Sequence, residues 1–544
     1  MKKRVLACTL AAFAACGTMA CMTSCSNVVD LSGKLAIWVL DAGYGTAWID
    51  EMVKEYNKIY PDVEVAVVKD NTIASKFDAA IKDPSSNEYD LIFSNILNVN
   101  QYVGMNYKVG GKVYEDLVLN LSDNLYNKKP IGKDGVEESV TVGSKIRAEF
   151  KDVVTNESDK EMYAYPYAGG ASGIIYNAKL FEEKNWEVPE TTDELLELTY
   201  KIYNEEVVGK KEGEKIYPWV WTGKCPSYWQ QMEYAMYGTY VGFDNYRAFW
   251  QAKEYQSADG SMPGTPSNGD LSARTPEVFN NKGRLDTLTV MEKILYPDAS
   301  DSSIKEGDER YDHGYCVPYS SSASVDKAQY DFMNGNAAMY VCGSWFEREM
   351  EDWFKENPNA DVELKVMKTP VLSSAKAMWD EALAEDRVTQ KEYDQAMNMQ
   401  FSGGADLTCV IPAYSTEQEQ AINFLRFMSS DYGAMIYAKY AKSILPLNYN
   451  WSDSSFTNTF KDFVKPGSFL QSQIDLDKTC TYAYDGSRIN KVFYQNSIVE
   501  FFPNGQFPEP KMSSLVRGER RTALQLFNSY YSTVTGGWQG VSGK

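Results

Sequence analysis

The residues best suited to chemistry in this sequence are large aromatic side chains that stand beside small polar residues at breaks in the local pattern. The stretch FMNGNAAMYVCGSWF, residues 332–346, shows the arrangement clearly. An apolar run, Ala337–Cys342, predicts a buried strand between two glycine-containing breaks, and Trp345 follows the second break directly. Two explanations fit this position. Trp345 packs into the core, or the tip of the strand lines a binding cleft.

Other aromatic residues share this setting. Trp219, Trp221, Tyr228 and Trp229 lie in YPWVWTGKCPSYWQQ, residues 217–231, which we expect to be a loop because of its proline and glycine residues, and Tyr167 follows Pro166. Sugar rings have apolar C–H faces and polar edges, so aromatic faces beside Asp, Asn and Ser suit them. For each aromatic residue alone, core packing explains the position equally well. As a set in loops, they are harder to assign to a core.

Motifs for catalysis, metals or phosphate binding are not found. The single histidine, His313, lies in YDHGYC, and GGASG at 169–173 lacks the spacing of a nucleophile elbow. The cysteines beyond the N-terminal region form no C-x-x-C pair, and DGSMPGTPSNGD at 259–270 lacks EF-hand spacing. We therefore expect no cofactor and no metal. A glycosidase that uses two carboxylates stays open, because the chain has 75 acidic residues.

Strands and helices that alternate along the first hundred residues would position these side chains. KLAIWVL, residues 34–40, predicts a strand, and apolar residues at helical spacing predict a helix from Trp48 to Ile59. Further strands are expected at 63–68 and 89–95. This order predicts an α/β fold with a largely parallel sheet, in which ligands bind beyond the carboxyl ends of the strands. The rule indicates Asp41, Tyr44, Ser94 and Asn95.

Later segments are less regular. Residues 98–160 and 254–325 look like insertions that are rich in loops. A capping box from Thr191 to Glu194 predicts the start of a helix, and the spacing of apolar residues predicts another after Gly283. LTCVIP, residues 407–412, predicts a strand before an amphipathic helix, and a last helix is expected at RTALQLFNSYY, residues 521–531.

The N-terminus has the composition of an export signal. Lys2, Lys3 and Arg4 precede a modest apolar stretch, which favours a signal peptide at residues 1–24 over a membrane helix. MACMTSCSN resembles a bacterial lipoprotein processing site, which implies a lipid on Cys25, or alternatively on Cys21, and a tether over residues 25–33. Removing the three basic residues changes the formal net charge from −21 to −24. So negative a protein is a poor partner for nucleic acid.

Five segments in order resemble the extracellular solute-binding proteins of ABC importers, of the maltose- and oligosaccharide-binding type. The family's opening strand, helix and strand are similar to residues 34–65, and its hinge-crossing segment to YPYAGGASGIIYNAKLFEE with Tyr176-Asn177. Residues 332–346 are similar to its most recognisable motif. GGADLTCVIPAYSTEQEQAINFLRFMSS and then ILPLN resemble its late strand, helix and proline turn.

This resemblance implies a two-lobed periplasmic-binding-protein type II fold, with a mostly parallel sheet flanked by helices in each lobe and a hinge between them. We expect the first lobe at 34–165 plus 366–430 and the second at 166–365 plus 431–544. The implied protein is not an enzyme. It is a lipid-anchored monomer on the outer face of the bacterial cytoplasmic membrane that captures an oligosaccharide and delivers it to the transmembrane subunits of an ABC permease. Its implied ligand-binding residues are Asp41, Tyr44, Ser94, Asn95, Tyr167, Trp219, Trp221, Tyr228, Trp229 and Trp345.

Some positions depart from the family pattern. Gly169-Gly170 stands where some oligosaccharide binders have a carboxylate, and Ser94 stands where an aromatic residue is possible. Two alternatives therefore stay open: a receptor for a non-carbohydrate solute such as a peptide, a polyamine or a modified sugar, and a secreted glycosidase.

Overall fold

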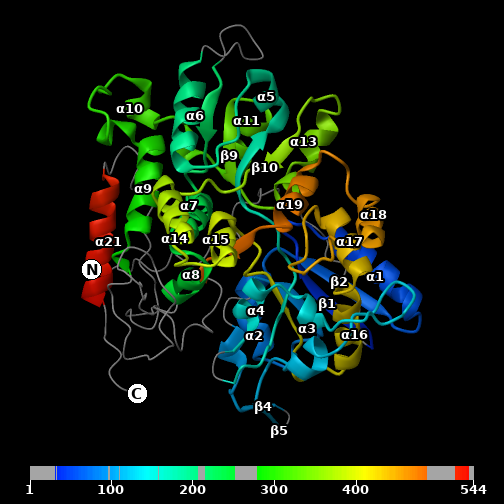
Figure 1. Ribbon diagram of the computed structural model, residues 1–544. Helices are drawn as coiled ribbons and strands as arrows, with labels where there is room; N and C mark the ends of the chain where they lie inside the picture. The colour runs from blue at the N-terminus through cyan, green and yellow to red at the C-terminus, as the bar shows by residue number, and fades with distance from the viewer. Residues whose placement is uncertain are drawn as a thin grey trace, which may run out of the picture.

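The protein consists of two lobes, each built on a β-sheet with helices against it (Figure 1). The computed structural model describes residues 31, 33–95, 99–109, 111–156, 159–205, 215–250, 279–486 and 521–537. The predicted signal peptide, Cys21, Cys25, most of the tether and most of the loop at 254–280 lie outside these residues. No helix in the described part of the chain combines the length and the apolar character needed to cross a bilayer.

The first lobe contains a five-stranded sheet in the order β2-β1-β3-β12-β6. Its first three strands are parallel, as the N-terminal pattern predicted, whereas β12 runs antiparallel to β3 and β6. Nearly all side chains of β1 and all of β3 are buried, because helices cover both faces of the sheet. The strands are β1 (Leu35–Leu40), β2 (Val65–Asp70), β3 (Leu91–Ser94), β12 (Thr408–Val410) and β6 (Tyr165–Pro166).

The second lobe contains a four-stranded sheet in the order β10-β7-β9-β8. The run Ala337–Cys342 forms its fully buried strand β9, as predicted. The expectation of a mostly parallel sheet is wrong here: β9 pairs parallel with β8 but antiparallel with β7, and β7 pairs antiparallel with β10. Strand β7 runs in the opposite direction to β8, β9 and β10, and it lies between β10 and β9. The other strands are β10 (Leu364–Val366), β7 (Gly173–Asn177) and β8 (Tyr217–Val220).

Two of the described segments that connect the lobes run near the centre of the molecule. Residues 167–172 lead from β6 in the first sheet to β7 in the second, which confirms the predicted crossing. Residues 402–407 lead from β11 (Met399–Phe401) to β12. Strand β11 pairs parallel with β13 (Thr481–Ala483), and Phe401 forms a bridge with Ser172, so the two crossings lie side by side.

Helices account for most of the remaining described residues. Helix α6 begins with the predicted capping box, in which Thr191 and Glu194 each bind the other's backbone N–H. The helices are α1 (Ala47–Ile59), α2 (Ile73–Ile81), α3 (Val142–Lys145), α4 (Ala148–Val154), α5 (Ala178–Lys184), α6 (Thr192–Asn204), α7 (Ser227–Val241), α8 (Phe243–Trp250), α9 (Lys282–Leu295), α10 (Glu309–His313), α11 (Val325–Met333), α12 (Phe346–Glu349), α13 (Glu351–Glu356), α14 (Ser373–Ala384), α15 (Gln390–Met397), α16 (Gln418–Met428), α17 (Asp431–Ala441), α18 (Ser454–Lys461), α19 (Phe469–Asp477) and α21 (Ala523–Gly537).

The predicted division between the lobes is wrong in two places. Helices α14 and α15, expected in the first lobe, pack against α7, and the Trp379 ring of α14 joins the core around β8 and β9. Helix α17, expected in the second lobe, packs along α1 of the first lobe. In both cases the helix packs on another helix that lies far from it in the sequence, and this pairing cannot be recognised from the helix alone.

The predicted insertion at 98–160 contains short elements rather than one irregular loop. A hairpin of β4 (Tyr107–Val109) and β5 (Lys112–Tyr114) projects from the first lobe (Figure 1). Helix α4 then packs against β6 and β13 beside the crossings. Its preceding residue, Arg147, donates hydrogen bonds to the Asp477 carboxylate at 3.0 Å and the Cys480 carbonyl at 2.7 Å. This part of the insertion therefore packs against the segments that connect the lobes.

Candidate functional site

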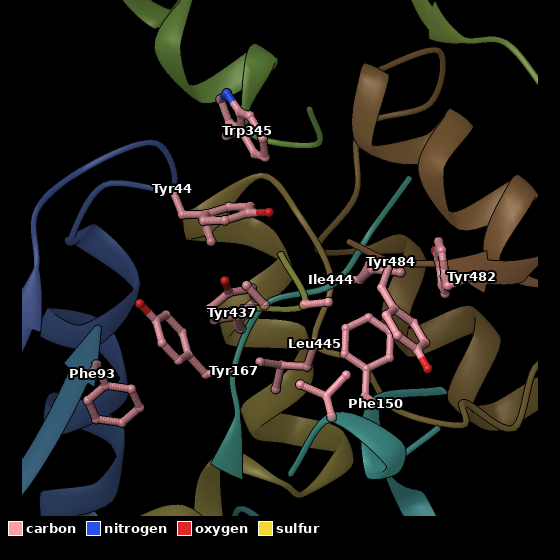
Figure 2. Close-up of a cluster of buried hydrophobic side chains, with 14 of the residues drawn as sticks. Tyr44, Phe93, Phe150, Tyr167, Trp345, Tyr437, Ile444, Leu445, Tyr482 and Tyr484 are labelled. Carbon is pink, nitrogen blue, oxygen red and sulfur yellow. The ribbon is translucent and has the colours of Figure 1, made fainter. Parts of the chain in front are cut away.

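The two lobes meet where the turn after β1 touches the tip of β9. The Tyr44 ring, from the first lobe, packs edge-to-face on the Trp345 ring, from the second, with centroids 5.9 Å apart at 82°. The Tyr228 ring, from the first turn of α7, also packs edge-to-face on Trp345, with centroids 6.0 Å apart. Figure 2 shows Trp345 above Tyr44, with Tyr437 beneath it. Aromatic residues of both lobes therefore form one contact.

Three glycines make room for the Trp345 side chain. A Cβ atom at Gly43 would lie 3.5 Å from the Trp345 Cβ, which is ordinary contact, whereas one at Gly403 would lie 2.8 Å from the indole ring. At Gly343 the distance would be only 2.1 Å. A larger residue at Gly343 or Gly403 would displace the indole. Glycine at these positions thus leaves the space that the tryptophan side chain occupies.

Polar groups join the lobes beside the aromatic contact. The Tyr44 hydroxyl and the Ser344 hydroxyl share a hydrogen bond of 2.7 Å, and the Ser344 hydroxyl lies 2.9 Å from the Gly169 carbonyl, to which it donates. The Gln473 amide donates to the Ser344 carbonyl at 3.1 Å. Burial raises the pKa of Tyr44 far above its usual value, so the phenol stays neutral and keeps its proton for hydrogen bonding.

A small cavity of ≈ 30 Å³ lies beside this contact, and Gly403 belongs to both. One face of α7 forms one wall, and the crossing segment 402–407 forms the other. The lining is rich in hydroxyl, amide and carboxylate groups, which suits a hydroxylated ligand. It consists of Ser227, Gln230, Gln231, Tyr234, Phe401, Ser402, Gly403, Ala405, Asp406 and Asp485.

Glu349 presents a carboxylate one helical turn after Trp345. The Glu349 side chain is exposed at the surface, and the buried Gln329 amide donates to one of its oxygens. Removal from bulk water is the main reason why the pKa of Glu349 rises to about 7, with a smaller contribution from the nearby charge of Asp326. The residue is a hydrogen-bonding group beside the aromatic contact whose charge changes near neutral pH.

Three predicted site residues come together here: Tyr44, Tyr228 and Trp345. Tyr167 lies deeper in the first lobe, where its ring packs on Trp48 at 5.9 Å and on Phe93 at 5.2 Å. It supports the turn that carries Tyr44 rather than lining the cavity.

The polar residues predicted at the strand ends have different surroundings. Asp41 is exposed at the end of β1 and starts the turn that ends in Tyr44. Ser94 is fully buried at the end of β3, and its hydroxyl donates to the Asn95 side chain at 3.3 Å. Asn95 is half-buried beside residues 96–98, which lie outside the described part. None of the three lines the cavity.

The loop predicted at 217–231 is wrong, and this changes the position of three tryptophans. Residues 217–220 form β8, which pairs with β9, and α7 begins at Ser227. Trp219, Trp221 and Trp229 are therefore buried in the core of the second lobe, where the Trp229 ring lies 5.4 Å from Trp219 and 6.1 Å from Trp221. Their side chains pack the sheet against α7 and offer no face to a ligand in this arrangement.

The remaining candidate groups lie elsewhere. His313 ends α10, where its ring lies 5.8 Å from Tyr217, and burial lowers its pKa. The five cysteines among the described residues are buried and unpaired with one another. Within the described ranges, no cluster of histidine, cysteine and acidic residues could hold a metal ion.

The sequence prediction missed the residues of the cavity. Ser227, Gln231 and Ser402 carry no recognisable motif, and they meet only because α7 packs beside the crossing segment. The one available signal was the Gly403-Gly404 pair directly before a predicted strand, which indicates a close approach of another part of the chain.

The sequence matches the family described as bacterial extracellular solute-binding protein over residues 51–462. The chain belongs to this family of binding proteins. No curated protein matches the sequence.

Solved structures with the same two-lobed fold cover nearly the whole chain. RafE in complex with raffinose is 14% identical and has a TM-score of 0.52, with 92% of this chain and 99% of that chain covered. An ABC substrate-binding protein from Listeria monocytogenes in complex with cycloalternan is also 14% identical, with a TM-score of 0.52 and coverages of 92% and 98%. The GacH receptor of Streptomyces glaucescens is 14% identical, with a TM-score of 0.53 and coverages of 94% and 99%.

Proposed function

We propose that the protein is the substrate-binding component of an ABC importer and that it captures an oligosaccharide between its lobes. The observation that carries this proposal is the contact of Tyr44 with Trp345 across the lobes, next to a cavity of polar side chains. An aromatic face beside hydroxyl and amide groups matches the two surfaces of a sugar ring. Raffinose, cycloalternan and acarbose complexes among the structures of the same fold support a carbohydrate.

Capture follows from the geometry of the lobes. The rings of Tyr44, Tyr228 and Trp345 are buried against one another in this arrangement, so the lobes have to open to admit a sugar. A sugar that then contacts Tyr44 on one lobe and Tyr228 and Trp345 on the other favours the renewed approach of the lobes. The crossing segments 167–172 and 402–407 are the positions where the backbone would bend. Asp41 and Asn95 would bind hydroxyl groups at the edge of the first lobe. Tyr167 would stabilise the site indirectly, through its packing on Trp48 and Phe93.

Delivery requires partners outside the chain. In this proposal a lipid on Cys25 holds the protein at the outer face of the membrane, and the lobes, in their closed arrangement, dock on the transmembrane subunits of a permease. The protein acts as a monomer and binds its solute without chemical change. A non-carbohydrate solute is the second candidate, because acidic side chains, Asp406, Asp485 and Glu349, lie in and beside the site.

A thermal-unfolding screen of the purified protein against monosaccharides and oligosaccharides tests the proposal. A ligand that binds only the folded state stabilises it by about 2.7 kcal/mol at a hundredfold excess over Kd. We expect a clear rise in Tm with one class of oligosaccharide. A broad carbohydrate panel without any rise, followed by a rise with peptides or polyamines, would replace the sugar with that solute and leave the fold assignment unchanged.

A further inference from the structure

Asp406 belongs to the second of the two crossing segments, where this segment runs beside the first. The Tyr167 N–H donates to the Leu407 carbonyl at 3.1 Å, so the two segments are hydrogen-bonded directly next to Asp406. A Cβ atom at Gly404 would lie 3.0 Å from the backbone of the first segment and 3.0 Å from the Tyr44 hydroxyl. Glycine at this position therefore allows a close approach that brings Asp406, two residues later, to the region between the lobes.

The Asp406 side chain lies near the contact of Tyr44 with Trp345. It lines the cavity beside this contact together with Gly403, whose backbone approaches the Trp345 indole closely. Burial is the main reason why the pKa of Tyr44 is raised, and the negative charge of Asp406 raises it further, as expected for a carboxylate near the phenol. Ala405 is buried, whereas Asp406 is partly exposed, so a solute between the lobes can reach it.

Two further carboxylates lie around the contact. Asp485 lines the same cavity, and Glu349 lies at the end of α12. The Arg348 guanidinium lies against Gly45 of the first lobe, where a Cβ atom would be 2.6 Å from its Nε, and it forms an ion pair with Glu351. The carboxylates add to the negative charge that an acidic ligand would meet here.

The chemistry of a carboxylate defines what Asp406 can bind. An ionised carboxylate only accepts hydrogen bonds, so it binds groups that donate them. Every hydroxyl group of a neutral sugar can donate, and a hydrogen bond to a charged acceptor is stronger than one between neutral groups. The carboxylate of a uronic acid has no proton to donate when it is ionised, and the negative charge of Asp406 would repel it.

We propose that the Asp406 carboxylate binds hydroxyl groups of the sugar and makes the site selective for neutral over acidic oligosaccharides. The inference rests on the proposed function and specifies its substrate class. Tyr44 and Trp345 contact the C–H face of a sugar ring, and Asp406 binds its hydroxyl edge. Neutral oligosaccharides bind, whereas counterparts in which uronic acid replaces a neutral sugar bind more weakly.

Calorimetric titration of the purified protein with matched sugars tests this inference. The panel contains raffinose and the trisaccharides of glucose, mannose and galactose, and each one that binds is compared with a counterpart in which hydroxymethyl groups are oxidised to carboxylates. We expect the acidic counterpart to bind the wild-type protein at least about tenfold more weakly, because it places like charges side by side. Asp406→Asn keeps the size of the side chain and removes its charge. It should weaken binding of the neutral sugar at least about tenfold and reduce the ratio between the two sugars.

Asp62→Asn is the matched control, because it removes the same charge at an exposed position. Asp62 follows the C-terminal end of α1, whereas Tyr44 precedes the N-terminal end of this 13-residue helix, so the control lies about 20 Å from the contact. The variant should keep the wild-type Kd and the wild-type ratio. Tm values of both variants verify folding.

The outcomes separate this inference from the proposed function. Wild-type affinity of Asp406→Asn for the neutral sugar would overturn the inference and leave the oligosaccharide function intact, and so would an equal loss of affinity in Asp62→Asn. Equal affinity of the wild-type protein for a neutral sugar and its acidic counterpart has the same meaning, and this comparison needs no variant to fold. A panel in which no sugar binds would overturn both.

Discussion

Replacing Trp345 with alanine should affect ligand binding more than folding, whereas replacing Trp229 should do the opposite. Trp229 is completely buried inside one lobe, between the rings of Trp219 and Trp221. Truncation there leaves a cavity that a packed core cannot close, and we expect a loss of about 3–5 kcal/mol in the free energy of unfolding.

Trp345 is 5% exposed but lies between the lobes, next to three glycines and in contact with the Tyr44 and Tyr228 rings. The lobes can shift into the space it leaves, so the cost should be close to the transfer free energy of the side chain, about 2 kcal/mol. Loss of an aromatic anchor from a binding site costs about 2 kcal/mol of affinity, which corresponds to about thirtyfold in Kd.

Urea unfolding measures the first quantity, and calorimetric titration with the oligosaccharide found in the thermal screen measures the second. Trp229→Ala should keep the wild-type Kd at temperatures where it is folded. If Trp345→Ala loses as much stability as Trp229→Ala and still binds the sugar with wild-type affinity, Trp345 is a core residue only and takes no part in binding.

Three further predictions concern two charged side chains, Glu349 and Arg147, and the cap of helix α6. The folded state raises the pKa of the Glu349 carboxyl from 4.5 to about 7, so it holds this proton more tightly than the unfolded chain does, and its contribution to stability falls as the pH rises between these values. Glu349→Gln should therefore flatten the dependence of Tm on pH in this window, and an unchanged profile would contradict the shift. Arg147→Met leaves the buried Asp477 carboxylate without its cation and should lower the free energy of unfolding, measured in urea, by about 3–5 kcal/mol. Adding Asp477→Asn should recover part of this loss. Equal losses in the single and double variants would show that the pair is not coupled. Thr191→Ala removes the capping box of α6 and should cost about 1 kcal/mol, while Thr191→Ser should not, and a helix unaffected by either change would mean that the cap is not needed.

Local patterns predicted those parts of the fold in which neighbours in the sequence are also neighbours in space. The alternation of strand and helix through residues 34–95 predicted three parallel strands, and the glycine breaks around 337–342 correctly bounded β9. The predicted assignment of α14, α15 and α17 to the lobes was wrong, because an apolar helix face does not indicate which part of the fold it packs against. The antiparallel pairing of β7 and β9 is likewise a long-range property.

The site was predicted in part for the same reason. Tyr44 and Trp345 follow two predicted strands, and the structure brings them together between the lobes. That they bind the ligand, as the rule for strand ends indicates, stays a prediction. Trp219 and Trp229 were misplaced because proline and glycine residues nearby suggested a loop, although Trp219 lies in a buried strand and Pro226 precedes a helix. Gln231 and Ser402 could not be found, since only tertiary packing brings α7 to the crossing segment.

Small-angle X-ray scattering with and without a saturating oligosaccharide tests most directly whether the solute is captured between the lobes. If the sugar contacts Tyr44 on one lobe and Trp345 on the other, the radius of gyration should be smaller in its presence, and this compaction should be lost in Trp345→Ala. A sugar that binds with full occupancy and leaves the radius of gyration of the wild-type protein unchanged would contradict capture by lobe closure.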